Sequence, residues 1–469
     1  MGSSYPAVLA ALQARGRYGI RLGLGRTRAL LRVLGDPQGE LRGPLIGGTN
    51  GKGSVQAMVA ACLAAGGLRV GQTPKPHLVS YRERILIDGR PIAAEAFAAL
   101  VGEVLEIADR LARRLGPPTE FEVLTAAAFA AFARAGVDVA VVEVGLGGRL
   151  DATNAWDGGV AAITNVALDH RDRLGGTLEA IAGEKAPIIK RGDRAVSGAT
   201  GPGLAVIRRR ARRLGVPLRE TAPLEVLGMG RAGLRLAAPG LGEVRLALLG
   251  RHQAANAAVA LGILEALREA GIADLPPAAI RAGLEDSRWP GRLELLALPP
   301  DGRAVPADRT APDPAAPDIL LDGAHNPHGM AALAAALDEL RPHLSAGRPT
   351  LLIGLMADKD VAGIVGALAP AAALRGARII TTRVDAPRAL PAAELAAAWR
   401  AASPGGRHDV TPIGPLDEAL EAAVAAARAA GGPLVVAGSL YLVGAVRGRL
   451  VADDDLRDPE EQGTDPGHG

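Results

Sequence analysis

The sequence predicts an α/β protein of two domains, each built around a largely parallel sheet. Its 469 residues exceed the roughly 250–300 at which a single hydrophobic core stops growing. Hydrophobic residues make up 48% of the chain and charged residues 22%, so large cores can form. Short apolar, β-branched runs alternate with longer segments of helical periodicity, and this alternation is typical of parallel strands joined by crossover helices.

The first part of the chain follows this order. Arg and Leu recur at helical spacing over the first 40 residues, and 44–46 reads as a short buried strand that leads into two glycines. The dense runs 137–144 and 160–166 suit strands that are covered on both faces. Helices are predicted over 54–65, 93–115, 121–135, 254–270 and 277–284.

A break at Trp289-Pro290-Gly291-Arg292 marks the predicted domain boundary. We therefore expect a first domain over 1–288 and a second over 289–450. The segment 298–317 is rich in Pro, Asp and Ala and is predicted to be a surface loop. Strands then follow at 318–321, 350–353, 377–382 and 434–437, and helices at 329–340, 361–368, 392–401 and 416–430.

Composition argues against several classes of function. The 53 Lys and Arg nearly balance the 50 Asp and Glu, so a nucleic-acid partner is not expected. The longest uncharged apolar stretch, 429–446, is interrupted by glycines and a proline, so no membrane partner is expected either. Cys62 stands alone, which rules out an internal disulfide and favours a cytoplasmic protein. The acidic segment 451–469 is predicted to be a disordered tail.

Lysine and asparagine are rare in this arginine-rich chain. The five lysines are Lys52, Lys75, Lys185, Lys190 and Lys359, and the five asparagines are Asn50, Asn154, Asn165, Asn256 and Asn326. A retained lysine indicates a position where a compact ammonium or a modifiable amine is needed and arginine's planar fork fails. Chance survival is the alternative for any single residue.

A glycine-rich loop indicates nucleotide binding. Gly48-Thr49-Asn50-Gly51-Lys52-Gly53-Ser54 stands between a predicted strand and a predicted helix, which is the context of a P-loop. Its backbone N–H groups and the helix N-terminus would bind phosphate, with Lys52 at the β- and γ-phosphates and Ser54 on Mg²⁺. An ordinary glycine-rich turn is the alternative, because Gly53 is inserted into the usual pattern.

Two residues after neighbouring strands could bind the same metal ion. Glu143 ends an apolar strand, as the acidic residue of a Walker B motif does. His170 lies in the loop after the next strand, where a plain polar loop residue is the alternative.

These motifs resemble the folylpolyglutamate synthase and dihydrofolate synthase family of the Mur ligase superfamily. The P-loop and the run Glu143-Val144-Gly145-Leu146-Gly147-Gly148-Arg149-Leu150-Asp151-Ala152-Thr153-Asn154 carry the resemblance, which extends from about residue 15 to 445. Further matches are Leu168-Asp169-His170, Gly183-Glu184-Lys185-Ala186, His252-Gln253-Ala254-Ala255-Asn256-Ala257, Pro290-Gly291-Arg292, Asp322-Gly323-Ala324-His325-Asn326-Pro327-His328 and Asp358-Lys359-Asp360.

The resemblance implies a P-loop, Mur-ligase-like central domain with a parallel-rich sheet, followed by a smaller Rossmann-like α/β domain. It implies an ATP-dependent ligase that converts a pteroate or folate carboxylate into an acyl phosphate, which the amine of L-glutamate then attacks. The expected substrates are ATP, L-glutamate and either dihydropteroate or a reduced folate. Mg²⁺ is the expected metal, K⁺ is a further candidate cation, and a monomer is expected.

The resemblance also assigns roles to residues. ATP would be bound by Gly48, Thr49, Asn50, Gly51, Lys52, Gly53, Ser54, Asn256, Arg292 and Asp322. Catalysis would involve Lys52, Lys185, Arg292 and His325, and the metal would be bound by Ser54, Glu143, His170 and carbamylated Lys185. The pterin side would be formed by Leu22, Gly23, Leu24, Phe121, Glu122, Leu150 and Asp151. For Phe121 core packing is the alternative, for Lys185 a surface position, and for His325 an ordinary loop position.

Two positions depart from the family's pattern. Pro74-Lys75-Pro76-His77-Leu78 stands where the family usually has Thr-Ser-Pro-His-Leu, whose serine is a metal ligand. An ammonium cannot ligate Mg²⁺, although it could supply one cation's charge near the phosphates. Arg21 stands where the family has an acidic residue before Leu-Gly-Leu, which leaves the form of the pterin substrate open.

Other functions account for fewer of these residues. One alternative is a Mur-type ligase with a different carboxylate substrate. Those that build peptidoglycan carry a UDP-sugar domain before the P-loop domain, and the residues before Gly48 are not expected to leave room for one. A non-catalytic ATP-binding homologue is compatible with Lys75. A generic kinase or GTPase is disfavoured, since no Asn-Lys-x-Asp motif occurs. Within the family, the sequence leaves open which of the two ligation steps is catalysed.

Overall fold

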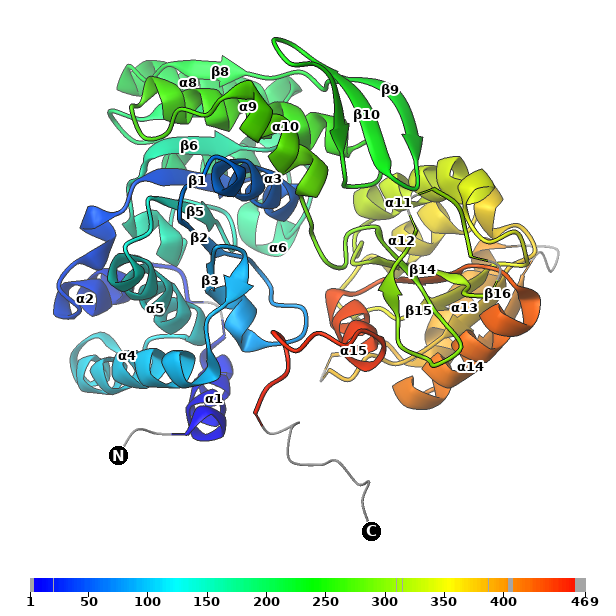
Figure 1. The fold of residues 1–469 in the computed structure, drawn as a ribbon. Helices are drawn as coiled ribbons and strands as arrows, with labels where there is room; N and C mark the ends of the chain where they lie inside the picture. Colours follow the sequence, from blue (N-terminus) through cyan, green and yellow to red (C-terminus); the bar gives the residue numbers. More distant parts are fainter. Residues whose placement is uncertain are drawn as a thin grey trace. The chain divides into compact units, whose positions relative to one another are not determined.

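The computed structural model describes residues 4–19, 21–308, 310–313, 315–386, 388–403 and 408–459. The chain divides into two compact units (Figure 1). Unit 1 comprises 1–224, 255–286 and 454–469, and unit 2 comprises 225–254 and 287–453. The change of unit after Asp286 lies close to the predicted boundary, whereas 225–254 groups with unit 2.

Unit 1 is built on an eight-stranded sheet in the order β4-β3-β2-β5-β1-β6-β7-β8. Strands β2, β5, β1, β6, β7 and β8 pair in parallel, and β3 and β4 add an antiparallel edge. The bounds are β1 Gly43–Gly47, β2 Val70–Thr73, β3 Leu86–Ile87, β4 Arg90–Pro91, β5 Val139–Glu143, β6 Gly159–Ile163, β7 Arg194–Ser197 and β8 Leu218–Glu220. Every residue of β1 and β5 is buried, as their unbroken apolar runs predict.

Helices cover this sheet. Phe97, Phe129 and Trp156 belong to a core that also contains Ala140 and Val142 of β5. This core is enclosed by α1, α2, α4 and α5 (Figure 1), while α3 packs against α10. The bounds are α1 Tyr5–Gln13, α2 Gly25–Val33, α3 Lys52–Ala65, α4 Ala94–Leu115, α5 Glu120–Ala135, α6 Arg171–Leu174, α7 Leu178–Lys185, α8 Gly201–Leu214, α9 Gln253–Glu269 and α10 Pro277–Asp286. Short 3₁₀ helices are η1 Ala14–Tyr18, η2 Pro37–Glu40, η3 Tyr81–Arg84, η4 Ala152–Ala155 and η5 Ala186–Ile188.

Unit 2 contains a seven-stranded sheet in the order β13-β12-β14-β18-β15-β16-β17. The neighbouring strands β14, β18, β15, β16 and β17 pair in parallel. Strands β12 and β13 add an antiparallel edge. The bounds are β12 Glu294–Ala297, β13 Val305–Pro306, β14 Asp318–Asp322, β15 Thr350–Ile353, β16 Arg378–Thr381, β17 Asp409–Pro412 and β18 Leu434–Ala437. The predicted surface loop 298–317 thus includes a short strand, β13, which pairs with β12.

The helices of unit 2 follow the predicted alternation, so the predicted α/β fold is confirmed. Their bounds are α11 Pro327–Leu340, α12 Val361–Leu368, α13 Ala392–Ala402, α14 Leu416–Ala430 and α15 Leu440–Leu450, with η6 Arg341–His343 and η7 Ala372–Leu374. In the described part of the chain, no helix is long and apolar enough to cross a membrane.

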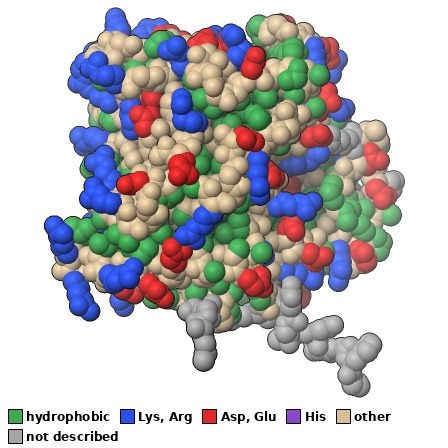
Figure 2. Space-filling model, turned by 60° about the vertical axis from the view of Figure 1, so that its left-hand side comes forward, with side chains coloured by type: hydrophobic (Ala, Val, Ile, Leu, Met, Phe, Trp, Pro, Cys, Tyr) green, Lys and Arg blue, Asp and Glu red, His purple; other side chains and the backbone are tan. Residues whose placement is uncertain are grey.

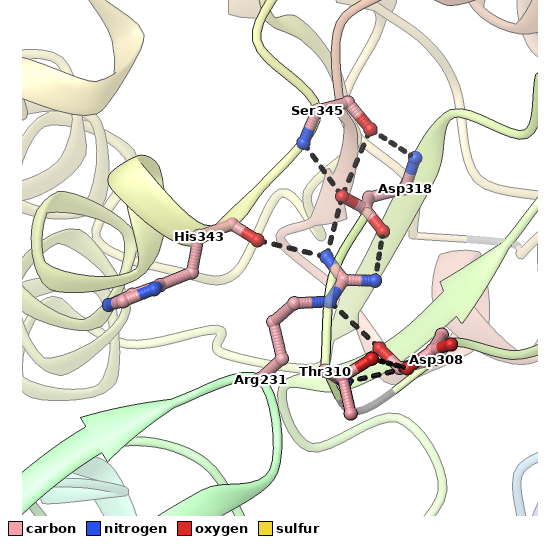
Figure 3. A network of polar contacts seen from close by, with 6 residues as sticks. All are labelled: Arg231, Asp308, Thr310, Asp318, His343 and Ser345. Carbon is pink, nitrogen blue, oxygen red and sulfur yellow. Dashed lines mark hydrogen bonds and ion pairs between the residues drawn. The ribbon is translucent and has the colours of Figure 1, made fainter. Parts of the chain in front are cut away.

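A three-stranded antiparallel sheet in the order β11-β10-β9 was not predicted. Its strands are β9 Glu225–Gly230, β10 Gly233–Ala238 and β11 Gly242–Leu246. Arg231, in the turn between β9 and β10, makes a bidentate ion pair with Asp318 at 2.8 and 2.9 Å (Figure 3). Its guanidinium also donates to the carbonyls of Asp308 and His343, and Ser345 bonds the same Asp318 carboxylate. This buried network joins the hairpin to the start of β14.

The end of the chain returns to unit 1. Oδ1 of Asp458 accepts hydrogen bonds from Tyr5 Oη at 2.9 Å, Ser80 Oγ at 2.7 Å and Arg82 Nε at 3.3 Å. The prediction of a disordered tail over 451–469 is therefore wrong for Asp458, which is bonded to unit 1. Residues 460–469 lie outside the described residues. Basic and acidic side chains are interspersed over the face drawn in Figure 2, in keeping with the balanced composition.

Candidate active site

The glycine-rich loop joins β1 to α3, and two of its positions accept only glycine. Gly48 has φ +148°, and a Cβ there would lie 1.9 Å from Oγ1 of Thr164. Gly51 has φ +82°, and a Cβ there would lie 2.2 Å from Oδ1 of Asn256. The left-handed backbone and these close approaches give the loop the sharp turn that a phosphate cradle needs.

A second loop, after β6, holds this one in place. The amides of Thr49 and Asn50 donate to the main-chain and side-chain oxygens of Asn165 at 3.1 and 2.9 Å. Thr164 Oγ1 donates in return to the carbonyl of Asn50 at 2.6 Å. The amides of the first turn of α3 then form the N-terminal end of a helix, which is suited to bind an anion. The scarcity of asparagine singles out Asn165, but no motif assigns it a role.

Two lysines converge on the carbonyl of Gly48. Nζ of Lys52 donates to Gly48 O at 3.3 Å and to Thr49 O at 3.2 Å, while Nζ of Lys185 donates to Gly48 O at 2.9 Å. Lys185 ends α7 and is 3% exposed, so it is not a surface lysine. Burial, reinforced by the nearby Lys52, lowers the pKa of Lys185 to about 7.

Glu143 ends β5 beside β1, with Ile46 as its partner in the register. Oε1 of Glu143 lies 4.0 Å from Nζ of Lys52. Oε2 accepts the backbone N–H of Lys75 at 3.2 Å, and the Glu143 carbonyl accepts Nζ of Lys75 at 2.5 Å. The Lys75 ammonium also lies 4.8 Å from the centre of the Phe121 ring. Burial lowers the pKa of Lys75 to about 8, against the opposing pull of Asp151 and Glu143.

The donor set fits an Mg²⁺ ion of the P-loop type. Ser54 and Glu143 offer the oxygen ligands that Mg²⁺ prefers, with phosphate oxygens completing the shell. His170 is exposed on its loop, at φ +48°. In the ranges that the structure describes, no group of three His, Cys, Asp or Glu side chains could hold a metal ion. Lys75 lies directly beside Glu143.

The predicted pterin-side residues come from distant segments and gather in unit 1. The amide of Gly23 donates to the carbonyl of Leu150 at 3.2 Å, which joins the 22–24 loop to the 150–151 turn. A Cβ on Gly145 would lie 2.8 Å from the Phe121 ring and 3.0 Å from Oδ2 of Asp151. Asp151 is also tied to the backbone, because it accepts the amides of Leu146 and Thr153. The Phe121 ring thus contacts the Lys75 ammonium, and Gly145 lies against both Phe121 and Asp151.

Glu122 has a role that the motif match did not assign. With Thr119 it forms a capping box at the start of α5, in which Thr119 N donates to Glu122 Oε2 at 2.8 Å. Nε of Arg26 donates to both carboxylate oxygens at 3.0 Å. Glu122 is 2% exposed, so it anchors Arg26 of α2, whose guanidinium also bonds Arg21 O. The Thr-x-x-Glu spacing was the signal that could have revealed this.

Three predicted residues gather at the end of β14 in unit 2. Asp322 accepts the amides of Leu293 and Ala324, each at 2.9 Å, and its burial raises its pKa although Arg292 opposes this. A Cβ on Gly323 would lie 2.3 Å from Nη1 of Arg292. Nδ1 of His325 lies 2.8 Å from Gly323 O. The structure therefore brings Arg292, Asp322 and His325 together, while Asn256 lies beside Gly51 in unit 1.

Comparison with known proteins identifies the family. Residues 46–264 match the Mur ligase middle domain and residues 310–440 the glutamate ligase domain of Mur ligases. The chain is 32% identical to the dihydrofolate synthase/folylpolyglutamate synthase of Bacillus subtilis over 460 residues, covering 96% of this chain and 100% of the relative. It is 40% identical to the protein of the same name from Mycobacterium tuberculosis, covering 80% and 77%.

Solved structures agree. Folylpolyglutamate synthase of M. tuberculosis, in complex with ADP and AMPPCP, has a TM-score of 0.80 at 35% identity and covers 95% of this chain and 99% of its own. The E. coli FolC protein, in complex with DHPP and ADP, has a TM-score of 0.78 at 28% identity, with coverages of 95% and 97%. The chain therefore belongs to the dihydrofolate synthase and folylpolyglutamate synthase family of Mur ligases.

Proposed function

We propose that this chain is an ATP-dependent ligase that joins L-glutamate to the carboxylate of dihydropteroate, of a reduced folate, or of both. One arrangement of residues carries the proposal. Lys52 and Lys185 both bond the phosphate loop, and Lys52 also lies near Glu143. The side chain of Lys75 bonds Glu143 and lies over the Phe121 ring. The phosphate loop and the Phe121 ring are thus linked through one residue, Glu143. The relatives bound to ADP, AMPPCP and DHPP support both halves of this assignment.

The reaction has two steps, because a carboxylate is a poor electrophile until it carries a leaving group. In the first, a carboxylate oxygen bonds to the γ-phosphorus, the bond from that phosphorus to the bridging oxygen breaks, and ADP leaves. In the second, the neutral amine of L-glutamate attacks the acyl carbon, phosphate leaves with the bonding electrons, and the amine proton is lost. The protein needs to position the reactants and neutralise charge, and no covalent nucleophile is required.

We infer that the first turn of α3 and Lys52 bind the β- and γ-phosphates. Ser54 and Glu143, with His170 as a further candidate, would hold Mg²⁺, which neutralises phosphate charge when it is bound. In unit 2, Asp322 orients the turn that carries Arg292 and His325. Arg292 would neutralise the transferring phosphoryl group, as a guanidinium suits planar, bidentate contacts with phosphate oxygens.

We propose that Lys185 is carbamylated. Carbamylation joins the nitrogen of the neutral amine to carbon dioxide and releases a proton, and the buried position and lowered pKa of Lys185 favour the neutral amine. The resulting carbamate would change a cation beside Gly48 into an anion that can orient a metal. Intact mass under bicarbonate, compared before and after acid treatment, should show an acid-labile adduct that Lys185→Arg lacks.

The test of the function is ATP-dependent incorporation of labelled L-glutamate in the presence of Mg²⁺ and bicarbonate. Dihydropteroate is supplied in one reaction and tetrahydrofolate in another, and Lys52→Met serves as the inactive control. Product in both reactions identifies a bifunctional enzyme, and product in one identifies its step. If folded protein that binds ATP makes no product in either, the ligase assignment fails and the non-catalytic homologue is favoured.

Further predictions accompany this function. We expect a cytoplasmic monomer with neither nucleic acid nor membrane as a partner, and K⁺ as a further candidate cation. Sedimentation of the purified protein tests whether it is a monomer. The dependence of the ligation rate on K⁺ tests the candidate cation. A Mur-type ligase with another carboxylate substrate would incorporate an amino acid only when that substrate replaces the pterin.

A further inference from the structure

Lys75 occupies a position that joins the two halves of the candidate site. Its backbone N–H and its ammonium both bond Glu143, at 3.2 and 2.5 Å. The ammonium lies over the Phe121 ring at 4.8 Å, a contact in which the negative face of the ring attracts the cation. Asp151 is close enough to affect the ionisation of Lys75. The ammonium is thus held between the main-chain carbonyl of Glu143 and the face of the Phe121 ring.

The segment after Lys75 is braced, so this position is not that of a loose surface side chain. Glu83 accepts the amides of Leu78, Val79 and Ser80 at 2.7 to 3.0 Å, which closes a capping box at η3. Ser80 is bonded in turn by Asp458. The backbone that carries Lys75 is therefore tied at both ends, to Glu143 on one side and to η3 on the other.

The charges around Glu143 leave no place for a second divalent ion. The Lys52 ammonium lies 4.0 Å from the Glu143 carboxylate, and the Lys75 ammonium bonds the main-chain carbonyl of Glu143. A dication placed on the Lys75 side would be repelled by a cation within a few ångströms, in surroundings that screen charge weakly. An ammonium has three N–H donors and no lone pair to offer a metal.

We propose that the Lys75 ammonium takes the place of a second divalent cation beside Glu143, so that the nucleotide-bound protein holds a single Mg²⁺ ion at this site. This inference rests on the proposed function for the substrate it names: Lys75 binds the pteroate or folate carboxylate as that group is phosphorylated. A fixed ammonium with three donors is suited to this task, because it can bond the attacking oxygen and a γ-phosphoryl oxygen together. The ammonium belongs to the chain itself, whereas a dissociable ion must be bound from solution.

Counting bound Mn²⁺ tests how many divalent ions the site holds, and it needs neither the pteroate or folate substrate nor glutamate. Electron paramagnetic resonance with Mn²⁺ and AMPPCP should give one tightly bound ion per wild-type chain and one for Lys75→Met. Lys75→Asp, which places a third carboxylate beside Glu143 and Asp151, should give two and a melting temperature that rises with Mn²⁺. Two ions in the wild type would overturn the proposal, as would one ion in folded Lys75→Asp, which would show that Lys75 is not what excludes the second.

Kinetics test the role toward the substrate. Lys75→Met should lower kcat about 100-fold, the size expected when one preorganised charge is removed from a developing anion, and leave the KM for ATP within about threefold. Lys190→Met is the matched control: its lysine also bonds a carbonyl, Trp156 O at 2.7 Å, but outside the site. This variant should lose thermal stability and still bind one Mn²⁺. A Lys75→Met enzyme with wild-type kcat would overturn the role in catalysis, and absence of ligation by the wild type would instead defeat the proposed function.

Discussion

Two segments at the same edge of one sheet are held in different ways. The phosphate loop after β1 depends first on its backbone, because Gly48 and Gly51 adopt left-handed conformations and a Cβ on either would clash with Thr164 or Asn256. Thr164 and Asn165 add only two side-chain hydrogen bonds to it in the described structure. The segment 74–84 after β2 depends on side chains. Glu83 bonds three successive amides there, Arg84 bonds His77, and Asp458 reaches across from the other end of the chain.

The difference shows which parts of an active site a motif can reveal. A loop that only glycine can form leaves a short pattern of adjacent residues, and the sequence Gly48 to Ser54 is such a pattern. A segment held by side chains requires partners, and these can lie anywhere in the sequence. Ser80 and Asp458 are separated by 378 positions, so no local pattern contains both. Mutations can separate the two modes of support.

The largest effect is expected where a side-chain network is fully buried. Arg231→Met leaves Asp318 as a buried charge without its bidentate partner, and such losses cost about 3–5 kcal/mol of folding free energy. Urea unfolding monitored in unit 2 measures this. Arg235→Met in the same hairpin removes an exposed ion pair with Glu243, so it should change stability by less than about 1 kcal/mol. Equal effects of the two substitutions would contradict the importance of burial.

The backbone-held loop should respond to a single methyl group. Gly51→Ala combines a left-handed backbone with a Cβ placed 2.2 Å from Asn256 Oδ1. Backbone strain of this kind costs about 1–3 kcal/mol, so ATP affinity should fall roughly tenfold to a hundredfold. Isothermal titration with AMPPCP measures the dissociation constant.

Gly67→Ala is the matched control for that substitution. Gly67 has almost the same φ, +81°, but a Cβ there would meet nothing within 4 Å. It should lower stability through strain alone and leave AMPPCP binding unchanged. If Gly51→Ala binds AMPPCP normally, the contact with Asn256 does not shape the phosphate loop.

Much of the fold was predictable because buried strands are written as unbroken apolar runs. The strands at Thr350–Ile353 and Leu434–Ala437 have the predicted bounds. The β9–β11 sheet was missed because its first strand is only partly buried and contains two glycines, which weakens both the alternation and the strand preference.

The site was predictable to the extent that motifs contain it. The positions of Lys52, Glu143 and Lys185 around the phosphate loop follow from short patterns, and the structure places Lys52 near Glu143 and bonds Lys185 to the loop. Their roles stay predictions. The ammonium of Lys75 over Phe121 could not be predicted, because it joins segments that meet only in the folded sheet.

A smaller, local effect is expected from the tail. Asp458→Ala removes the acceptor that Tyr5, Ser80 and Arg82 share. A hydrogen bond to a charged group contributes about 1.5–3 kcal/mol when it is buried, and less at a partly exposed site such as this one. Hydrogen exchange should become faster at the amides of 78–84 and stay unchanged in α3. Asp454→Ala, which removes an exposed pair with Arg457, is the control and should leave both regions unchanged. Unchanged exchange in Asp458→Ala would mean that Glu83 alone braces the segment.

The smallest effect is a pH dependence from His77. Arg84 Nε donates to Nδ1 of His77 at 3.0 Å, so that nitrogen is an acceptor, and burial together with Arg84 lowers the pKa of His77 to about 3. The unfolded chain, with a histidine pKa near ~6.5, binds a proton that the folded chain does not, so stability falls as pH falls from about 6.5 towards 3. The neighbouring Tyr81 ring, 4.1 Å away, would be retained beside an uncharged replacement.

His77→Phe should therefore flatten this part of the stability profile by at most about 1 kcal/mol between pH 7 and 5, because the site is not fully shielded from solvent. Urea midpoints of the two proteins at each pH measure the difference, with His343→Gln, an exposed histidine in unit 2, as the control. Parallel profiles for the wild type and His77→Phe would show that the proton is accommodated without breaking the Arg84 bond. In that case the 74–84 segment would accommodate a protonated His77 beside Arg84, and the bond between these two side chains would not be needed to hold the segment.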